Sequence, residues 1–116
     1  MKQFNVGDIV FVSDYGYKNG TTGTSHNFVI IDDGQAVDLN YFGFLISSQI
    51  KKATYPFNEM LYKNNTNNLH KDSIVKCDDL IKFSEDKIQF KIGEVTTDEY
   101  NTFITTYAQY LSENKD

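Results

Sequence analysis

The chain has 116 residues and a formal net charge of −5, with 40% hydrophobic and 15% aromatic residues. This length and composition predict a single globular domain over residues 1–116 with one modest core. All eleven basic residues are lysine, and the acidic balance argues against a general nucleic-acid coat protein while allowing a local basic groove. The single cysteine, Cys77, excludes an internal disulfide and a cysteine-cluster zinc site, so we expect a buried thiol.

The N-terminal residues contain no apolar signal segment, and no run of the sequence is long enough to span a membrane. We therefore expect a cytoplasmic protein without a membrane partner.

Short apolar runs separated by turn residues predict a series of strands. The first strand is expected at residues 6–13, and its run Ile9-Val10-Phe11-Val12 predicts that both faces are covered. Residues 14–25 are expected to form a long loop with a turn at Asn19-Gly20, of a length that is uncommon unless the loop binds or covers something. The other strands are predicted at residues 28–31, in the first half of 42–56, and at 57–62, 72–77 and 87–92. Residues 37–41 and 78–83 are ambiguous, and residues 63–68 are expected to form a polar loop.

Residues 97–111 carry the only convincing helix signal. Thr96 followed by Glu99 predicts a capping box at the start of the helix. Apolar side chains then recur at helical spacing and predict a stripe that docks on the sheet: Tyr100, Phe103, Ile104, Tyr107, Ala108 and Leu111. Several short strands followed by one helix predict a mostly β fold, a small, strongly curved antiparallel sheet or SH3-like barrel with one long C-terminal helix.

The stretch of residues 42–56 combines a buried strand with polar and basic side chains. The strand leads into hydroxyl, amide and ammonium groups in the order Ser47, Ser48, Gln49, Lys51 and Lys52. Hydroxyl and amide groups hydrogen-bond phosphate oxygens and lysine supplies charge, so a phosphodiester fits at this position. A core strand whose polar end exits into solvent is the simpler interpretation, and both alternatives stay open. In the preceding loop, Tyr15 and Tyr17 either stack on RNA bases or pack on the side of the barrel.

Five motifs follow one another in order over roughly residues 6–111. They are Gly7-Asp8-Ile9-Val10, Phe28-Val29-Ile30-Ile31, residues 46–53, Lys71-Asp72-Ser73-Ile74-Val75, and Lys91-Ile92-Gly93 ahead of the helix. This order resembles the MazF/PemK/Kid family, the toxins of type II toxin–antitoxin systems. The resemblance implies a homodimeric SH3-like barrel and metal-independent, sequence-selective cleavage of single-stranded RNA, with no cofactor. It also implies a cognate antitoxin whose C-terminal segment blocks the RNA groove.

The same resemblance implies catalytic positions, with one departure. The family's catalytic threonine or serine at the end of the third strand matches Ser47. Its catalytic arginine, normally followed by proline, falls at His26-Asn27. An arginine and an aspartate that some members add after the fifth strand fall at Ile81 and near Ser84. The hydroxyl is therefore kept and the guanidinium is lost.

Histidine at this place changes the expected chemistry. An imidazole can act as base or acid near neutrality, whereas arginine supplies permanent charge. We therefore expect a nuclease in which His26 and Ser47 are catalytic and Lys51 or Lys52 supplies the charge, or a non-catalytic SH3-like module that binds RNA or a peptide. His70, the only other histidine, is expected to be a surface residue rather than a catalytic partner.

Aromatic content bears on assembly. The chain carries nine Phe and eight Tyr, more than a barrel of six strands and one helix easily hides. We therefore expect part of this aromatic surface to meet a symmetric copy in a homodimer.

Overall fold

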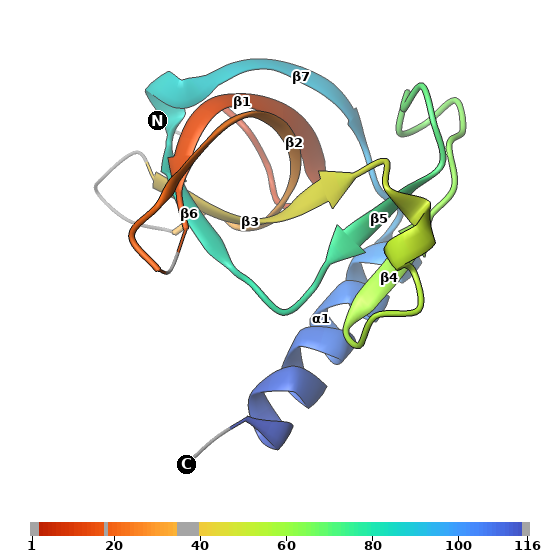
Figure 1. Ribbon diagram of the computed structural model, residues 1–116. Coiled ribbons are helices and arrows are strands. Elements are labelled where there is room, and N and C mark those ends of the chain that lie inside the picture. Colours follow the sequence, from red (N-terminus) through yellow and green to blue (C-terminus); the bar gives the residue numbers. More distant parts are fainter. Residues whose placement is uncertain (1–2, 18, 35–39, 115–116) are drawn as a thin grey trace.

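The computed structural model describes residues 3–17, 19–34 and 40–114. The elements run in the order β1 (Asp8–Gly16), β2 (Thr22–Asp32), β3 (Asn40–Ser47), η1 (Ile50–Lys52), β4 (Asn58–Leu61), β5 (Ser73–Lys76), β6 (Ile81–Ser84), η2 (Glu85–Lys87), β7 (Ile88–Glu94) and α1 (Thr97–Glu113). Figure 1 shows a curled sheet with one long helix at the C-terminal end, so the predicted mostly β fold is confirmed. Across the described residues, no helix is long and apolar enough to cross a membrane.

The seven strands form one antiparallel sheet. Its order is β4-β5-β3-β2-β1-β7, and β6 pairs with the first half of β3. Over the part of the chain that the structure describes, β4 and β7 stand at opposite ends of this order without pairing, so the sheet is curled but not closed. The ambiguous residues 78–83 contribute to β6, while residues 37–39 lie outside the described residues and β3 begins at Asn40.

Curling gives the sheet two buried faces, each with its own core. The core inside the curl contains Val10, Val12, Tyr15, Phe28, Ile30, Tyr41, Leu45, Ile81, Phe83 and Ile88. The core between the sheet and α1 contains Ile9, Val29, Ile31, Phe44, Ile46, Leu61, Leu69, Val75, Cys77, Val95 and Phe103. Ile9 therefore points into one core and Val10 and Val12 into the other, as predicted, while Phe11 is only partly buried and belongs to neither core. The thiol of Cys77 is buried, which confirms its predicted state.

The loop predicted at residues 14–25 is shorter than expected, because most of these residues belong to a long hairpin of β1 and β2. Tyr15 pairs with Gly23 across the hairpin. A Cβ atom on Gly23 would lie only 2.5 Å from the Tyr15 ring, so the glycine makes room for this side chain. The predicted turn at Asn19-Gly20 is confirmed, and Gly20 adopts a positive φ of +87° there.

Helix α1 begins with the predicted capping box. The Thr96 hydroxyl accepts from the Glu99 backbone N–H at 3.1 Å, and the Glu99 carboxylate accepts from the Thr96 N–H at 2.8 Å. The predicted stripe docks on the sheet, with Phe103 buried in the core. Ala108 and Leu111, at the end of the stripe, are exposed because the helix extends past the sheet (Figure 1).

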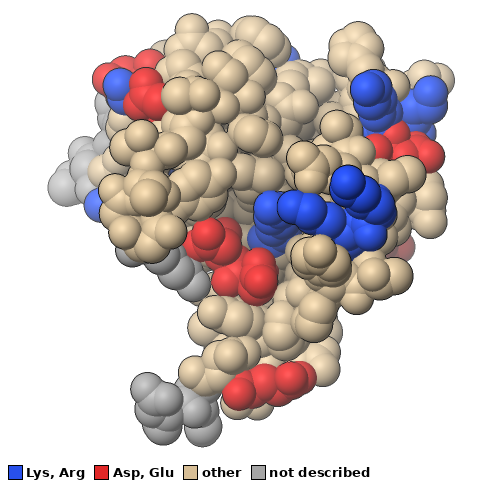
Figure 2. Space-filling model, viewed as in Figure 1, with Lys and Arg blue, Asp and Glu red and all other residues tan. Residues whose placement is uncertain are grey.

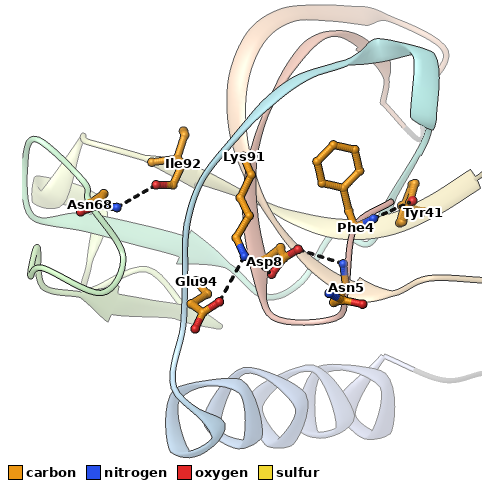
Figure 3. Close-up of polar contacts among 8 residues, drawn as sticks. All are labelled: Phe4, Asn5, Asp8, Tyr41, Asn68, Lys91, Ile92 and Glu94. Carbon is orange, nitrogen blue, oxygen red and sulfur yellow. Dashed lines mark hydrogen bonds and ion pairs between the residues drawn. The ribbon is translucent and has the colours of Figure 1, made fainter. Parts of the chain in front are cut away.

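An ion-pair cluster ties β1 to β7 (Figure 3). The buried Asp8 carboxylate accepts from the Asn5 backbone N–H at 2.9 Å and lies 3.1 Å from the Lys91 ammonium. Lys91 also reaches Glu94 at 3.2 Å. These contacts turn the ammonium of Lys91 toward its two carboxylates.

The predicted polar loop at residues 63–68 is confirmed, and it is a closely packed segment. Asn67 is fully buried, and its side-chain oxygen accepts from the backbone N–H groups of Asn64 and Leu69, both at 3.0 Å. A Cβ on Gly93 would lie 2.4 Å from the Asn67 carbonyl oxygen, so the loop packs directly on β7. The loop thereby fixes the position of His70, which follows it.

Candidate functional site

The ends of β2 and β3 and the segment before β5 enclose a cleft of about 360 Å³, the histidine cleft. Its lining residues are Phe11, Ser25, His26, Asn27, Ile46, Ser47, Ser48, Gln49, Leu69, His70, Lys71 and Ser73. The fold therefore brings together four of the residues singled out from the sequence: His26, Ser47, Ser48 and Gln49. Tyr15, Tyr17, Lys51 and Lys52 do not line this cleft.

His26 is half-buried on β2, and its Nδ1 atom is held by the protein. This nitrogen lies 2.9 Å from the Tyr15 hydroxyl oxygen and 3.2 Å from the Thr24 carbonyl oxygen. A carbonyl oxygen only accepts hydrogen bonds, so the tautomer protonated on Nδ1 satisfies it. Within the described residues, Nε2 has no hydrogen-bond partner. Nε2 is therefore the nitrogen available to a molecule in the cleft.

Tyr15 supports His26 from the core. Its ring is only 5% exposed and packs edge-on against Phe28, with ring centroids 4.8 Å apart. Its hydroxyl lies 3.3 Å from the hydroxyl of Tyr17. Burial, and to a smaller degree this hydrogen bond, raises the pKa of the Tyr15 hydroxyl, so the hydroxyl keeps its proton. Of the two alternatives for Tyr15, its burial and ring contacts favour packing on the barrel, and stacking on a base stays a prediction.

Ser47 ends β3 at the rim of the histidine cleft. It is half-buried, and its hydroxyl oxygen accepts from the Gln49 backbone N–H at 3.2 Å. This local turn points the chain away from the sheet and into η1. Within the described residues the Ser47 hydroxyl donates to no protein group, so its proton is available to a phosphate oxygen.

Sequence reasoning missed two residues of the histidine cleft, His70 and Lys71. His70 is exposed, as expected, but it faces the same cleft as His26. The reason is the pairing of β3 with β5, in which Ser47 stands opposite Ile74 and the residues before β5 lie beside the end of β3. Nothing local in the sequence signals this neighbourhood.

Lys52 and Tyr17 line a different groove, of about 580 Å³, which we call the mixed groove. Its charged lining residues are Lys52, Lys76, Asp78 and Asp79. Figure 2 shows lysine side chains and acidic side chains near one another on this face, so the groove carries charges of both signs. The exposed Lys51 also lies outside the histidine cleft. Among the described residues, Lys71 is the lysine that lines the histidine cleft, and the expectation that Lys51 or Lys52 supplies charge beside Ser47 stays a prediction.

The histidine cleft is lined by two imidazoles, hydroxyl groups and one ammonium group, and no carboxylate lines it among the residues that the structure describes. Within the described ranges Lys71 makes no ion pair. A cleft with an unpaired ammonium group and no described carboxylate is unusual on the surface of a chain with net charge −5. The arrangement can move protons, donate hydrogen bonds and attract an anion. No three His, Cys, Asp or Glu side chains gather as metal ligands anywhere in the described residues.

A comparison with models of protein families identifies the family to which the chain belongs. A family model described as PemK-like, MazF-like toxin of type II toxin-antitoxin system matches residues 5–108. The chain belongs to this toxin family. The family resemblance carried by the five sequence motifs is thereby confirmed. No curated protein matches the chain in sequence.

Two solved structures share the fold of this toxin-family member. One is the Mycobacterium tuberculosis toxin MazF-mt6, with 12% identity, a TM-score of 0.62, and coverage of 91% of this chain and 93% of that one. The other is an endoribonuclease in complex with its cognate antitoxin from Mycobacterial species, with 15% identity, a TM-score of 0.66 and coverage of 97% and 96%. At these identities the likeness shows the fold.

Proposed function

We propose that this chain is an endoribonuclease toxin that cleaves single-stranded RNA at selected sequences, by attack of a ribose 2′-hydroxyl on the adjacent phosphate. The observation that carries the proposal is the histidine cleft, where two histidines, Ser47 and Lys71 meet without a lining carboxylate. Membership of the toxin family and the fold shared with a protein named an endoribonuclease support it. Catalysis of this reaction needs a base, an acid for the leaving 5′-oxygen, and positive charge near the phosphorane.

The contacts of His26 suggest how the roles divide. With Nδ1 donating to the Thr24 carbonyl, Nε2 of His26 carries a lone pair and takes the proton of the 2′-hydroxyl. His70, in its protonated form, gives a proton to the departing 5′-oxygen. Ser47 donates a hydrogen bond to a non-bridging phosphate oxygen, and Lys71 stabilises the negative charge. The products are a 2′,3′-cyclic phosphate and a 5′-hydroxyl, and the proposed chemistry uses side chains alone.

The test is cleavage of a long transcript by purified protein, with product ends analysed by mass spectrometry. His26→Ala and His70→Ala should each lower the rate about 10²- to 10⁴-fold, because each removes a proton-transfer group. Ser47→Ala should cost less if it removes one hydrogen bond to phosphate. Lys71→Ala should weaken cleavage, while Lys63→Ala, an exposed lysine outside the cleft, serves as its matched control.

Two results would contradict the assignment. Cleavage that survives His26→Ala unchanged would place the chemistry at other residues, and cleavage that stops in EDTA would show a metal requirement that the proposal does not include. His26→Arg, which restores the residue that the family resemblance implies, should retain activity if charge stabilisation limits the rate. A wild-type chain that binds RNA and cuts none would instead favour the non-catalytic module of the same fold.

We also propose a cognate antitoxin and a homodimeric assembly. The antitoxin is supported by the family and by the similar structure that is a complex with one. The homodimer is supported by large apolar side chains that remain exposed, among them Ile50, Tyr55 and Leu111. Growth arrest on expression should be relieved by co-expression of a small acidic protein encoded beside the gene. Light scattering should give twice the chain mass, and a monomer mass at micromolar concentration would refute the dimer.

A further inference from the structure

An aromatic pair with one exposed ring lies at the edge of the histidine cleft. Phe11 of β1 and Phe90 of β7 are cross-strand neighbours whose rings are nearly parallel, with centroids 5.2 Å apart and an interplanar angle of 11°. Phe90 is 54% exposed, although the chain has two cores in which such a ring can be buried. Because Phe11 covers one face of Phe90, a large part of the exposed area belongs to the other face and the edge.

The pair contributes to a second cleft of about 650 Å³, the phenylalanine cleft. Its lining residues are Phe11, Asn27, Asn68, Leu69, His70, Phe90, Lys91 and Ile92. Four of these residues, Phe11, Asn27, Leu69 and His70, also line the histidine cleft. The two clefts therefore adjoin, and a chain bound at His26 and His70 would continue over Phe90.

The polar side chains that line the phenylalanine cleft are two amides, Asn27 and Asn68, together with His70 and Lys91. The Asn68 side-chain N–H donates to the Ile92 carbonyl at 3.0 Å (Figure 3), which leaves its oxygen as the acceptor. Asn27 has no side-chain hydrogen bond within the described residues, so it offers both a donor and an acceptor. Lys91 is paired with Asp8 and Glu94, and its charge is already compensated. The cleft thus combines an apolar flat surface with two amide groups and the His70 imidazole.

The geometry points to a nucleobase subsite: Phe90, backed by Phe11, stacks on a base of the bound RNA next to the scissile phosphate, and Asn27 hydrogen-bonds the edge of that base. This inference rests on the proposed ribonuclease function and specifies where one base is held. Single-stranded RNA is bound in this way because every base has a flat face, and its unpaired edge is open to amide groups.

RNA fits this surface better than a second protein chain does. The phenylalanine cleft continues directly into a cleft with two histidines and Lys71, and among the described residues no carboxylate lines either cleft or pairs with Lys71. A polymer that alternates flat bases with phosphate groups matches an aromatic surface beside an anion-attracting one.

The experiment uses the absence of tryptophan from the chain. Phe90→Trp places a single tryptophan, which can be excited apart from the tyrosines, on the proposed subsite, and Tyr62→Trp places one at a position that is 64% exposed and lines neither cleft. The probe is a short RNA that spans a cut site mapped with the wild-type protein. A 2′-deoxynucleotide on the 5′ side of the scissile bond removes the nucleophile and prevents cleavage. Stacking should quench Phe90→Trp and leave Tyr62→Trp unchanged.

Affinity and turnover give a second measure. Phe90→Leu keeps an apolar side chain but loses the aromatic face, and should raise Kd for the same RNA about 5- to 150-fold. Phe90→Tyr should bind as tightly as the wild type. Because Phe90 does not touch the reacting atoms in this arrangement, Phe90→Leu should raise KM and leave kcat nearly unchanged.

Three outcomes would overturn the subsite. If the wild type cleaves RNA while both tryptophan variants respond alike, or Phe90→Leu binds as tightly as the wild type, the base is held elsewhere and the ribonuclease function stands. If Phe90→Leu changes the molecular mass in light scattering, Phe90 contacts another protein chain instead. If the wild type neither binds nor cuts RNA, the proposed function fails and the subsite fails with it.

Discussion

Gly23→Ala tests the link between the hairpin and His26. The added Cβ would lie 2.5 Å from two carbons of the Tyr15 ring and 2.6 Å from its hydroxyl oxygen, closer than packed atoms approach. The ring cannot simply retreat, because Phe28 and Tyr17 pack edge-on against it with centroids at 4.8 and 5.3 Å. We therefore expect Tyr15 to shift and its hydrogen bond to His26 to be lost.

The size of the effect follows from three contributions. Overpacking costs about 1–3 kcal/mol, and losing a part-buried hydrogen bond adds about 1 kcal/mol. Replacing glycine within a strand returns about 0.5–1 kcal/mol. The net loss in free energy of unfolding is about 1–3 kcal/mol, which for 116 residues lowers Tm by roughly 4–12 °C.

The assay is thermal unfolding followed by circular dichroism, with RNA cleavage measured below both transitions. Gly16→Ala is the matched control: it lies in the same hairpin, no atom lies within 4 Å of its added Cβ, and its φ is not positive. Gly16→Ala should melt at or slightly above the wild-type temperature. Gly23→Ala should cleave more slowly, because Nδ1 of His26 loses the Tyr15 hydroxyl, one of its two hydrogen-bond partners. Equal melting temperatures and equal cleavage for the two variants would refute the reasoning.

Two further predictions concern the helix and the buried thiol. Thr96→Ala removes the capping box and should lower the free energy of unfolding by about 1 kcal/mol, or Tm by roughly 4 °C. Thr105→Ala, on the exposed face of the helix, is the control and should not lower Tm. Equal melting temperatures for the two variants would show that the cap is dispensable. Burial raises the pKa of the Cys77 thiol, so above the unfolded value of about 8.5 the folded state binds more protons than the unfolded state. Stability in urea should therefore fall as the pH rises from about 8.5 toward 10, by at most about 1.4 kcal/mol per pH unit, and Cys77→Ala should lack this slope. A slope that persists in Cys77→Ala would assign it to another group.

Local patterns predicted the elements whose determinants lie close together in the sequence. The helix was predictable because Thr96, Glu99 and the apolar stripe lie within one segment. The extent of the β1–β2 hairpin was not, because it depends on a cross-strand fit between Tyr15 and Gly23 rather than on local propensity.

Some residues of the candidate site could likewise be predicted from the sequence, and others could not. His26 and Ser47 were identified as catalytic candidates through the family resemblance, and the fold places both in the lining of one cleft. His70 and Lys71 join them only through the pairing of β3 with β5, which no local pattern specifies. Lys52 follows Ser47 closely in sequence but lines another groove, since η1 turns the chain away.

The pairing of β1 with β7 also affects how the protein is made. A ribosome delivers β1 first and β7 among the last segments, and long-range pairing of this kind cannot form until both have emerged. Until then β1 lacks one strand neighbour, Asp8 lacks Lys91, and Phe11 lacks Phe90. A nascent chain ending before Ile88 should therefore be protease-sensitive and harmless to the cell that makes it. Protease resistance of such a fragment in pulse-labelled translation would show that β7 is dispensable for folding.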